Sequence, residues 1–383
     1  MKKAVAALLA AAALPLAAAQ DPWGCAQVPA AAFTPIALAS PSGAGIDLAF
    51  VPYGGTAQKL HARGRDGQLR DVLLGFDDAS QYCKGTLGDA GHPYFGALIG
   101  RVANRITNGH AVIDGRDAYF PINEAPGNDT LHGGTFGFDR KVWAVTLLNK
   151  SAALLQYTSP DGEMGFPGTL SVNVTYVVSE DSWTIAYSAT ALDADTIFAP
   201  TQHAYWNLAG SAALVTEHRM AVPDGAYVLD VSPFLLPTGA LLSVADAASS
   251  FLDFRVEKAV GRDIGAGTLF SWGHGYDHAW IFGNWTSGQA PVERVRVVSP
   301  ESGIGMAVST DQPSVQIYSG NFLNGTIPQK SGQDPSAFYE HWGALAIEAQ
   351  HYPDAPNHAS FPPITLYKGQ TYAQTTTYRF FVA

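Results

Sequence analysis

Charged side chains are scarce in this chain of 383 residues: Asp, Glu, Lys and Arg make up 14% of it, whereas soluble domains average about a quarter. Acidic residues outnumber basic ones, 33 to 22, and the formal net charge is -11. The sequence has no basic cluster and no aromatic residues interleaved with basic ones, which are the features that bind nucleic acid. We therefore exclude a nucleic acid as a partner.

Cysteine is almost absent, since only Cys25 and Cys83 occur. A CxxC spacing is missing, so neither a structural zinc site nor a dithiol redox centre is expected. In an exported chain, two cysteines most simply pair with each other. We predict a disulfide between them that ties the N-terminal segment to the body of the fold.

Long apolar runs are missing as well, except at the N-terminus. Two lysines precede an apolar stretch that ends in three alanines before Gln20. The stretch is short for a bilayer span and contains Pro15, so a secretory signal peptide fits better than a membrane anchor. We predict a signal peptide over residues 1–19 and a secreted protein that has no membrane association.

Asparagine occurs unusually often in one motif. Five of the eleven asparagines stand in Asn-x-Ser/Thr with no proline in the middle, the acceptor motif for N-linked sugar. This number favours a eukaryotic secretory route over a bacterial periplasm, and it predicts a glycoprotein. The candidate acceptors are Asn128, Asn149, Asn173, Asn284 and Asn324.

Apolar and polar residues alternate with a period of two along much of the chain. Residues 170–178 and 183–190 alternate in this way, and Arg294 and Arg296 alternate with two valines. Such alternation predicts half-buried strands of antiparallel sheets. The 39 glycines and 24 prolines supply the many turns that short strands need. Helical periodicity is scarce, and only residues 244–254 suggest a short helical turn.

No linker, repeat or composition break divides the chain, although its length alone suggests two domains. The polar residues that could carry chemistry are spread from the first third to the last tenth of the sequence. They can meet only if nearly the whole chain folds as one unit. We therefore predict an all-β fold with a single domain over residues 20–383, a large antiparallel β-sandwich whose sheets pack face to face.

Three segments place a polar side chain among apolar and glycine neighbours. Burying such a side chain is costly unless it is paired or used, and His132, His203 and Glu348 together could move protons near neutral pH. Glu348 has the most apolar setting of any acid, and desolvation would raise its pKa toward that of a useful general base. For each histidine the alternative is a satisfied core or turn residue. The segments are residues 131–134, 201–208 and 346–350.

Residues 100–106 contain two arginines and Asn104 in an otherwise apolar stretch. An arginine such as Arg105 could form a forked contact with sugar hydroxyls or a carboxylate. The alternative is a structural ion pair, with Asp139 or Asp114 as the acidic partner.

Further polar residues lie beside aromatic or apolar neighbours. Tyr205 and Trp206 follow His203 closely, and a sugar-binding cleft needs such flat apolar faces next to hydrogen-bonding groups. Asp277 has a turn-like setting, in which an Asx-turn is as good an interpretation as a ligand role. Gln316 is an uncharged polar residue on an apolar strand.

Six motifs, taken together and in one order, resemble the aldose 1-epimerase (galactose mutarotase) family over roughly residues 94–380. Any one of these motifs is weak by itself, whereas six in register are specific. They are residues 100–106, residues 131–134 with 137–139 and Trp143, residues 203–210, residues 275–278, residues 320–322 and residues 348–363.

The resemblance implies a galactose mutarotase-like supersandwich and an isomerase that interconverts the α and β anomers of free aldoses, such as galactose or glucose, with no cofactor and no metal. By this resemblance Glu348 is the general base that takes the proton of the C1 hydroxyl, and His203 is the acid that protonates the ring oxygen. Such chemistry needs one acid and one base of matched pKa. The residues that match the family's binding of sugar hydroxyls are Arg105, His132, Asp277 and Gln316, with Asn104 beside them.

The sequence also departs from the family's usual pattern. Gln202 and Ala204 flank His203 where the family usually has asparagine and serine or threonine, which leaves the preferred aldose open. The loop 127–130 is longer than usual and brings the glycan acceptor Asn128 close to the cleft.

The rival function is a non-catalytic carbohydrate-binding protein on the same sandwich, which would not need both His203 and Glu348. A glycoside hydrolase would need a second catalytic carboxylate, for which Asp277 is the only candidate. A sugar-phosphate epimerase is disfavoured because no cluster of arginine or lysine awaits a phosphate. The oligomeric state stays open between monomer and homodimer.

Overall fold

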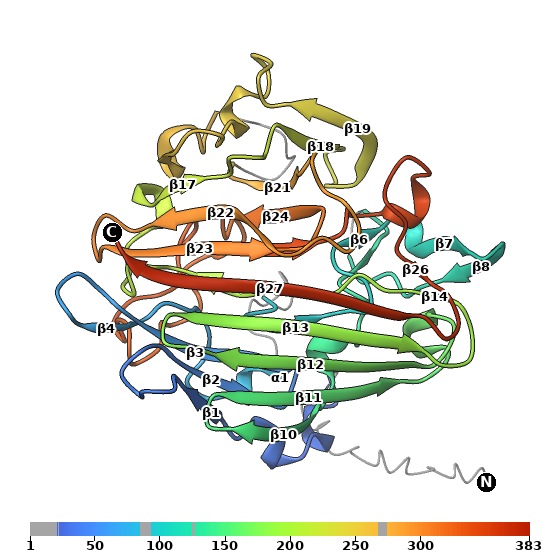
Figure 1. Cartoon of the computed structure of the whole chain (residues 1–383), viewed down its shortest axis with the longest axis horizontal. Helices are drawn as coiled ribbons and strands as arrows, with labels where there is room; N and C mark the ends of the chain where they lie inside the picture. The colour runs from blue at the N-terminus through green and yellow to red at the C-terminus, as the bar shows by residue number, and fades with distance from the viewer. Residues whose placement is uncertain (1–20, 22, 85–92, 125–126, 267–273) are drawn as a thin grey trace, which may run out of the picture.

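The computed structural model describes residues 21, 23–84, 93–124, 127–266 and 274–383, so the predicted signal peptide lies outside the described residues. Within the described ranges the chain forms two large antiparallel sheets, one of nine strands and one of six (Figure 1). A smaller sheet of four strands precedes them in the sequence. The all-β class is therefore confirmed.

The nine-stranded sheet contains the longest strands, which lie side by side across Figure 1. In spatial order its strands are β10 (Ala144–Asn149), β11 (Ala152–Ser159), β12 (Leu170–Val178), β13 (Ser182–Ala191), β27 (Thr371–Val382), β23 (Ile304–Thr310), β22 (Val292–Val298), β17 (Arg219–Ala221) and β20 (Lys258–Ala259).

The six-stranded sheet carries most of the residues that matter below. In spatial order its strands are β16 (Tyr205–Trp206), β25 (Leu345–Gln350), β24 (Ser314–Tyr318), β21 (Asp277–Ile281), β18 (Tyr227–Val231) and β19 (Pro237–Ser243). The four-stranded sheet is made of β1 (Ile36–Ala39), β2 (Asp47–Val51), β3 (Thr56–Arg63) and β4 (Leu69–Asp71).

Short strand pairs and single helical turns complete the described residues. The pairs are β5 (Leu98–Ile99) with β15 (Thr201–Gln202), β6 (Arg105–Ile106) with β9 (Thr130–Leu131), β7 (His110–Ile113) with β8 (Arg116–Tyr119), and β14 (Thr196–Ile197) with β26 (Thr365–Leu366). The helical turns include α1 (Gln81–Lys84) and η8 (Ser250–Leu252), the latter inside the segment predicted to hold one. None of the helices in the described ranges is long and apolar enough to cross a membrane.

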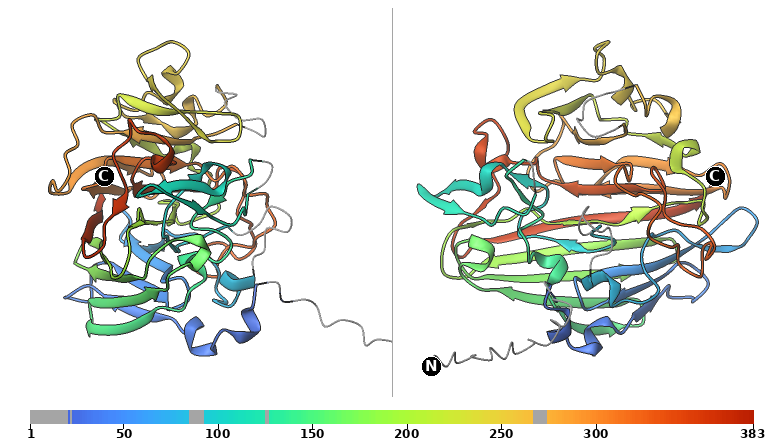
Figure 2. Two further views of the ribbon diagram at one scale, coloured as in Figure 1. Left: turned by 90° about the vertical axis from the view of Figure 1, so that its right-hand side faces the viewer. Right: turned by 180° about the vertical axis from the view of Figure 1, so that it is seen from behind.

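One hydrophobic core joins the three sheets. It contains Val174 and Ile185 of the nine-stranded sheet, Ile317 and Ile347 of the six-stranded sheet, and Phe50 of the four-stranded sheet. Seen from behind, the blue four-stranded sheet lies beside the green strands of the nine-stranded sheet (Figure 2). This shared core supports the prediction of one domain over residues 20–383, which stays a prediction.

Strands β12 and β13 confirm the alternation that predicted them. Their burial alternates residue by residue, and the two strands pair along nine positions, from Leu170 opposite Ala191 to Val178 opposite Trp183. The apolar set faces the core because a period of two sends successive side chains to opposite faces.

Strand β22 corrects part of the same prediction. Val295 and Val297 face the core as expected, but Arg294 is buried with them instead of facing solvent with Arg296. The pairing register with β23 shifts between Glu293 and Val295, and such a bulge redirects a side chain. The buried guanidinium then needs a partner, which Asp224 supplies at 2.6 Å.

The predicted disulfide between Cys25 and Cys83 is present and their Cα atoms lie 5.8 Å apart. Cys25 begins the turn η1 (Cys25–Gln27), and Cys83 is buried in α1 against an aromatic cluster that includes Phe76 and Phe95. The bond therefore fastens the N-terminal segment to the body of the fold, as expected.

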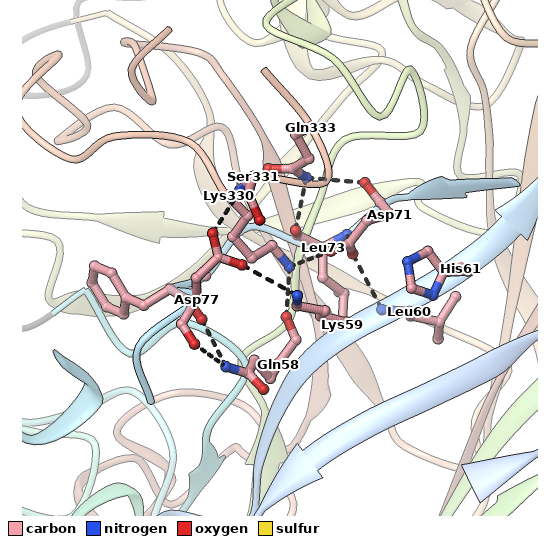
Figure 3. Close-up of polar contacts among 12 residues, drawn as sticks. Gln58, Lys59, Leu60, His61, Asp71, Leu73, Asp77, Lys330, Ser331 and Gln333 are labelled. Atoms are coloured by element: carbon pink, nitrogen blue, oxygen red, sulfur yellow. Dashed lines mark hydrogen bonds and ion pairs between the residues drawn. The ribbon is translucent and has the colours of Figure 1, made fainter. Parts of the chain in front are cut away.

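A buried ion pair fixes the loop 319–344, which connects β24 to β25 (Figure 3). The Lys330 ammonium lies 2.7 Å from an Asp71 carboxylate oxygen, and both side chains are at most 1% exposed. The same ammonium donates to the Gln58 carbonyl at 2.5 Å, and the Gln333 amide donates to the carbonyls of Asp71 and Leu73. We call Gln58, Asp71, Lys330 and Gln333 the loop anchor.

The loop anchor borders the strand that follows His203. Leu73 forms an isolated bridge with Trp206 of β16, and the Leu74 amide donates to the Tyr205 carbonyl at 3.0 Å. The segment after Asp71 is thus held by the loop on one side and by the six-stranded sheet on the other.

Candidate active site

Three neighbouring strands of the six-stranded sheet place polar side chains on one face. Gln316 on β24 stands directly opposite Glu348 on β25, and opposite residues of an antiparallel pair project to the same side. Asp277 begins β21, so the turn setting predicted for it is wrong. The Gln316 amide donates to Asp277 Oδ1 at 2.6 Å, which places the two next to each other.

His203 lies between two short strands, each of which fixes its backbone. The preceding strand β15 pairs with β5, and the following strand β16 pairs with β25. The His203 amide donates to the Ala97 carbonyl and its own carbonyl accepts from Gly96, both at 2.9 Å. The imidazole Nε2 then stands 3.5 Å from Glu348 Oε1.

His132 and Asn104 hold each other through two hydrogen bonds. The Asn104 amide donates to His132 Nδ1 at 3.2 Å, and the His132 amide donates to the Asn104 carbonyl at 3.0 Å. Because Nδ1 accepts, a neutral His132 carries its proton on Nε2. Both residues have a positive φ, 62° for Asn104 and 53° for His132. Such angles are uncommon outside glycine and are concentrated at functional sites.

The predicted partners of the arginines in residues 100–106 are wrong. Arg105 forms a forked ion pair with Glu124, at 2.6 and 2.7 Å, and pairs with neither Asp139 nor Asp114. Arg101 is also buried, but it bonds to Ser159, Thr196 and backbone carbonyls away from the site. Arg105 is thus the arginine of the site.

Two tyrosines enclose the His203 ring. Tyr94 and Tyr205 both stack with it, at centroid distances of 5.8 and 4.9 Å, and the His132 ring meets it edge-on at 5.1 Å. Trp206 was expected to offer a face to a sugar, but it lies in the hydrophobic core against Tyr378. That part of the prediction is wrong, because Trp206 projects to the opposite side of β16.

Burial drives the pKa values of Glu348 and His203 in opposite directions. Desolvation raises the pKa of Glu348 well above its usual value; the nearby Asp277 adds to this effect and Arg105 opposes it. Desolvation also lowers the pKa of His203 to about 3. The order that a carboxyl and an imidazole have in water is thereby reversed, so burial favours a protonated, neutral Glu348 beside a neutral His203.

His132, His203 and Glu348 are of types that bind metal ions. One donor atom of each lies within 4.8 Å of the others, so we tested whether the three fit a metal site. The hydrogen bond from Asn104 argues against this function. A histidine that binds a metal through Nε2 normally donates Nδ1–H to an acceptor, whereas Nδ1 of His132 itself accepts from a backbone amide. The donor set therefore fits a proton-transfer site better than a resident metal ion.

A small pocket, partly open to solvent, lies beside Gln316 and Asp277. One side of it is polar and the other is apolar. Its lining residues are Asn104, Asp277, Gln316, Leu229, Val231, Leu235, Pro237, Ala279 and Pro353.

The structure brings together all seven residues that the sequence proposed for the site. Two further residues were missed: Glu124, which neutralises Arg105, and Tyr94, which stacks on His203. Neither stands out in the sequence. Both lie in loops, where no periodic pattern marks them, and neither contacts a sequence neighbour. The seven residues are Asn104, Arg105, His132, His203, Asp277, Gln316 and Glu348.

Gln202 and Ala204, the two residues beside His203 that differ from the pattern expected of the resemblance, are both buried away from the site. The Gln202 amide donates to the Gly96 carbonyl and accepts from the Tyr176 hydroxyl at 3.1 Å, while Ala204 is fully buried in the core. Gln202 therefore supports the segment that holds the His203 backbone, and it does not face the pocket.

Comparison with known proteins gives a consistent result. A sequence model of the aldose 1-epimerase family matches residues 40–379. A galactose mutarotase of Rattus norvegicus is 35% identical over 341 residues, which cover 88% of this chain and 92% of the relative. An aldose 1-epimerase of Escherichia coli is 34% identical over 340 residues, with the same two coverages.

Solved structures of the same kind share the fold. The crystal structure of a GalM/aldose epimerase homologue from C. elegans superposes with a TM-score of 0.78 at 30% sequence identity. The alignment covers 91% of this chain and 99% of that one.

Proposed function

This chain belongs to the aldose 1-epimerase family, and from that premise we propose that it is a secreted enzyme that interconverts the α and β anomers of free aldoses such as galactose or glucose. The observation that carries the proposal is the buried His203–Glu348 pair, in which His203 Nε2 lies 3.5 Å from Glu348 Oε1. Ring opening needs one group to take a proton and another to give one, and this pair supplies both.

In the proposed reaction the pair shares one proton throughout. Once this proton has passed from Glu348 to His203 across their 3.5 Å contact, the Glu348 carboxylate takes the proton of the C1 hydroxyl while His203 gives its proton to the ring oxygen, so the C1–O5 bond breaks and the aldehyde forms. Glu348 and His203 are then both neutral, which is the state that burial favours. After rotation about C1–C2, both proton transfers reverse and the ring closes as the other anomer.

The remaining polar residues are suited to hold the sugar hydroxyls. Asp277 has a second carboxylate oxygen beyond the one that Gln316 binds, and His132 can donate from Nε2 because its Nδ1 accepts. Arg105 and Asn104 complete the polar side. A binding protein without turnover would need such contacts but not the matched acid and base, which favours the enzyme.

Secretion is proposed on two observations. The Cys25–Cys83 disulfide fits an oxidising compartment, and residues 1–19 have the pattern of a signal peptide. Four of the glycan acceptors are exposed, namely Asn128, Asn149, Asn284 and Asn324, whereas Asn173 is half-buried within β12. We expect N-linked sugar on the exposed acceptors.

Polarimetry tests the proposal. The wild-type protein should return freshly dissolved α-galactose, α-glucose or α-xylose to equilibrium faster than buffer alone does, at a rate proportional to its concentration. Equal rates with and without the protein, for every aldose tried, would remove the enzymatic function and leave the carbohydrate-binding alternative.

A further inference from the structure

The protonated form of His203 has little polar support in the structure. Its Nε2 lies 3.5 Å from Glu348 Oε1, the side chain is 6% exposed, and Nδ1 has no hydrogen-bond partner within the described residues. In the proposed reaction this imidazole carries a proton before the ring oxygen takes it. A buried cation is costly unless it is compensated, and Glu348 compensates the charge only on the side of Nε2.

Two tyrosine rings lie next to the same imidazole. The centroid of the Tyr205 ring is 4.9 Å from that of the His203 ring, with 24° between their planes, and the Tyr94 ring is 5.8 Å away at 25°. The face of a tyrosine ring is negative, and it attracts a cation that lies within about 6 Å of the ring centroid. Both tyrosines meet this condition for an imidazolium at His203.

The backbone holds both tyrosines beside His203. The Ala97 amide donates to the Tyr94 carbonyl at 3.2 Å, and the Ala97 carbonyl accepts from the His203 amide at 2.9 Å. Tyr94 has φ 56°, which is uncommon for a bulky residue and is concentrated at functional sites. Tyr205 begins β16, which pairs with β25, the strand of Glu348. The fold itself therefore places both rings next to the imidazole.

We propose that Tyr94 and Tyr205 are positioning residues that stabilise the protonated His203 ring through the faces of their own rings and so speed the opening of the sugar. The inference rests on the proposed function, in which His203 is the acid. Because the resting pair is neutral, stabilising the charged imidazole lowers the free energy of the state from which the sugar ring opens. The effect acts through His203 and needs no bond to the sugar, so it falls on kcat and not on KM. Tyr205 is the nearer ring and has the larger share.

A series of fluorinated phenylalanines in place of each tyrosine tests the proposal. Fluorine withdraws electrons from the face of the ring and leaves the shape of the ring nearly unchanged, so the attraction to a cation weakens stepwise from phenylalanine through its 4-fluoro, 3,5-difluoro and 3,4,5-trifluoro derivatives. Every member lacks the hydroxyl, so its loss is common to the series. From the first member to the last we expect kcat for α-galactose to fall by about tenfold at Tyr205 and by about threefold at Tyr94, while KM changes less than about twofold.

The matched control is the same series at Phe50, a fully buried ring of the hydrophobic core that meets Tyr176 edge-on at 5.3 Å. Fluorination there changes a buried aromatic ring in the same way, but no charge forms beside it during the reaction. We expect kcat to change less than about twofold across the control series. Urea denaturation of each variant separates a loss of folded protein from a loss of rate.

The outcomes separate the inference from the proposed function. If kcat stays level or rises with fluorination at Tyr205, or falls as much at Phe50, the tyrosine faces do not act on the charge of His203 and the epimerase function stands. A level series at Tyr94 alone removes that residue from the inference. If the wild-type protein accelerates the mutarotation of no aldose, the proposed function fails and the inference fails with it.

Discussion

The loop anchor and the active site each contain a buried basic residue next to a buried acidic one, but the two pairs differ in their distances and hydrogen bonds. Lys330 Nζ lies 2.7 Å from Asp71 Oδ2, and Asp71 Oδ1 also accepts from the amides of Leu60 and Leu73. His203 Nε2 lies 3.5 Å from Glu348 Oε1. Within the described residues, His203 Nδ1 and Glu348 Oε2 have no hydrogen-bond partner.

The difference shows which buried pair can do chemistry. When a buried ion pair is in close contact and its remaining atoms are bonded, the removal of one partner leaves the other as an uncompensated buried charge. A pair that lies farther apart and has buried polar atoms without a hydrogen-bond partner lowers the stability of the fold, since buried polar groups normally have such partners. Such a pair persists where the free atoms serve a substrate. We therefore expect the anchor to govern stability and the His203–Glu348 pair to govern the rate.

The largest effect should come from breaking the loop anchor. Lys330→Met removes the ammonium and leaves the Asp71 carboxylate buried without its cation, so the free energy of unfolding should fall by about 3–5 kcal/mol. Urea denaturation measures the loss, and kcat per folded molecule should change less than about threefold. Adding Asp71→Asn should restore part of the stability, because the amide oxygen still accepts from Leu60 and Leu73.

The next largest effect concerns the acid of the active-site pair. His203→Asn should lower kcat by at least about a hundredfold, because no group is then placed to protonate the ring oxygen. Its free energy of unfolding should change little, in contrast to Lys330→Met. A His203→Asn enzyme that keeps near wild-type kcat would show that His203 does not carry the proton.

A smaller effect concerns the pH dependence of stability. The pKa of Glu348 is raised in the folded state, so the folded state retains a proton that the unfolded state loses once the pH exceeds the usual value of about 4.3. The contribution of Glu348 to wild-type stability therefore falls as the pH rises from there toward the folded pKa. Glu348→Gln removes this fall, so its stability relative to wild type should increase with pH over that window, by about 1 kcal/mol or more. Thermal unfolding across pH 4–8 measures the divergence, and parallel curves for the two proteins would contradict the raised pKa.

An effect of similar size concerns the binding side of the site. Asp277→Asn keeps the size of the side chain and its bond to Gln316 but weakens its acceptance of sugar hydroxyls. We expect kcat/KM to fall by about tenfold, mostly through KM, since the interaction is made before and during the reaction. A loss confined to kcat would instead place Asp277 in the proton transfer.

Much of the fold could be predicted because its signal is local. The alternation in residues 170–178 and 183–190 marks β12 and β13 directly, and the apolar setting of Glu348 marks it as an unusual acid. Arg294 escaped prediction because a bulge in the pairing with β23 turned it inward, and such a register shift depends on the partner strand.

The remaining features depend on contacts between distant residues. Arg105 pairs with Glu124 across a loop, and Lys330 meets Asp71 although 258 residues separate them in the chain. Residue patterns could not distinguish the roles of His132 and His203 either. The hydrogen bond from Asn104 to His132, and the contact of His203 with Glu348, distinguish them in geometry.

The most direct test of the comparison is a paired measurement on Glu348→Gln at neutral pH, with kcat for α-galactose and the free energy of unfolding taken from the same preparation. We predict a loss of at least about a hundredfold in kcat together with a stability equal to or above that of wild type. A variant that keeps its kcat, or one that loses stability as Lys330→Met does, would contradict the distinction between the two pairs.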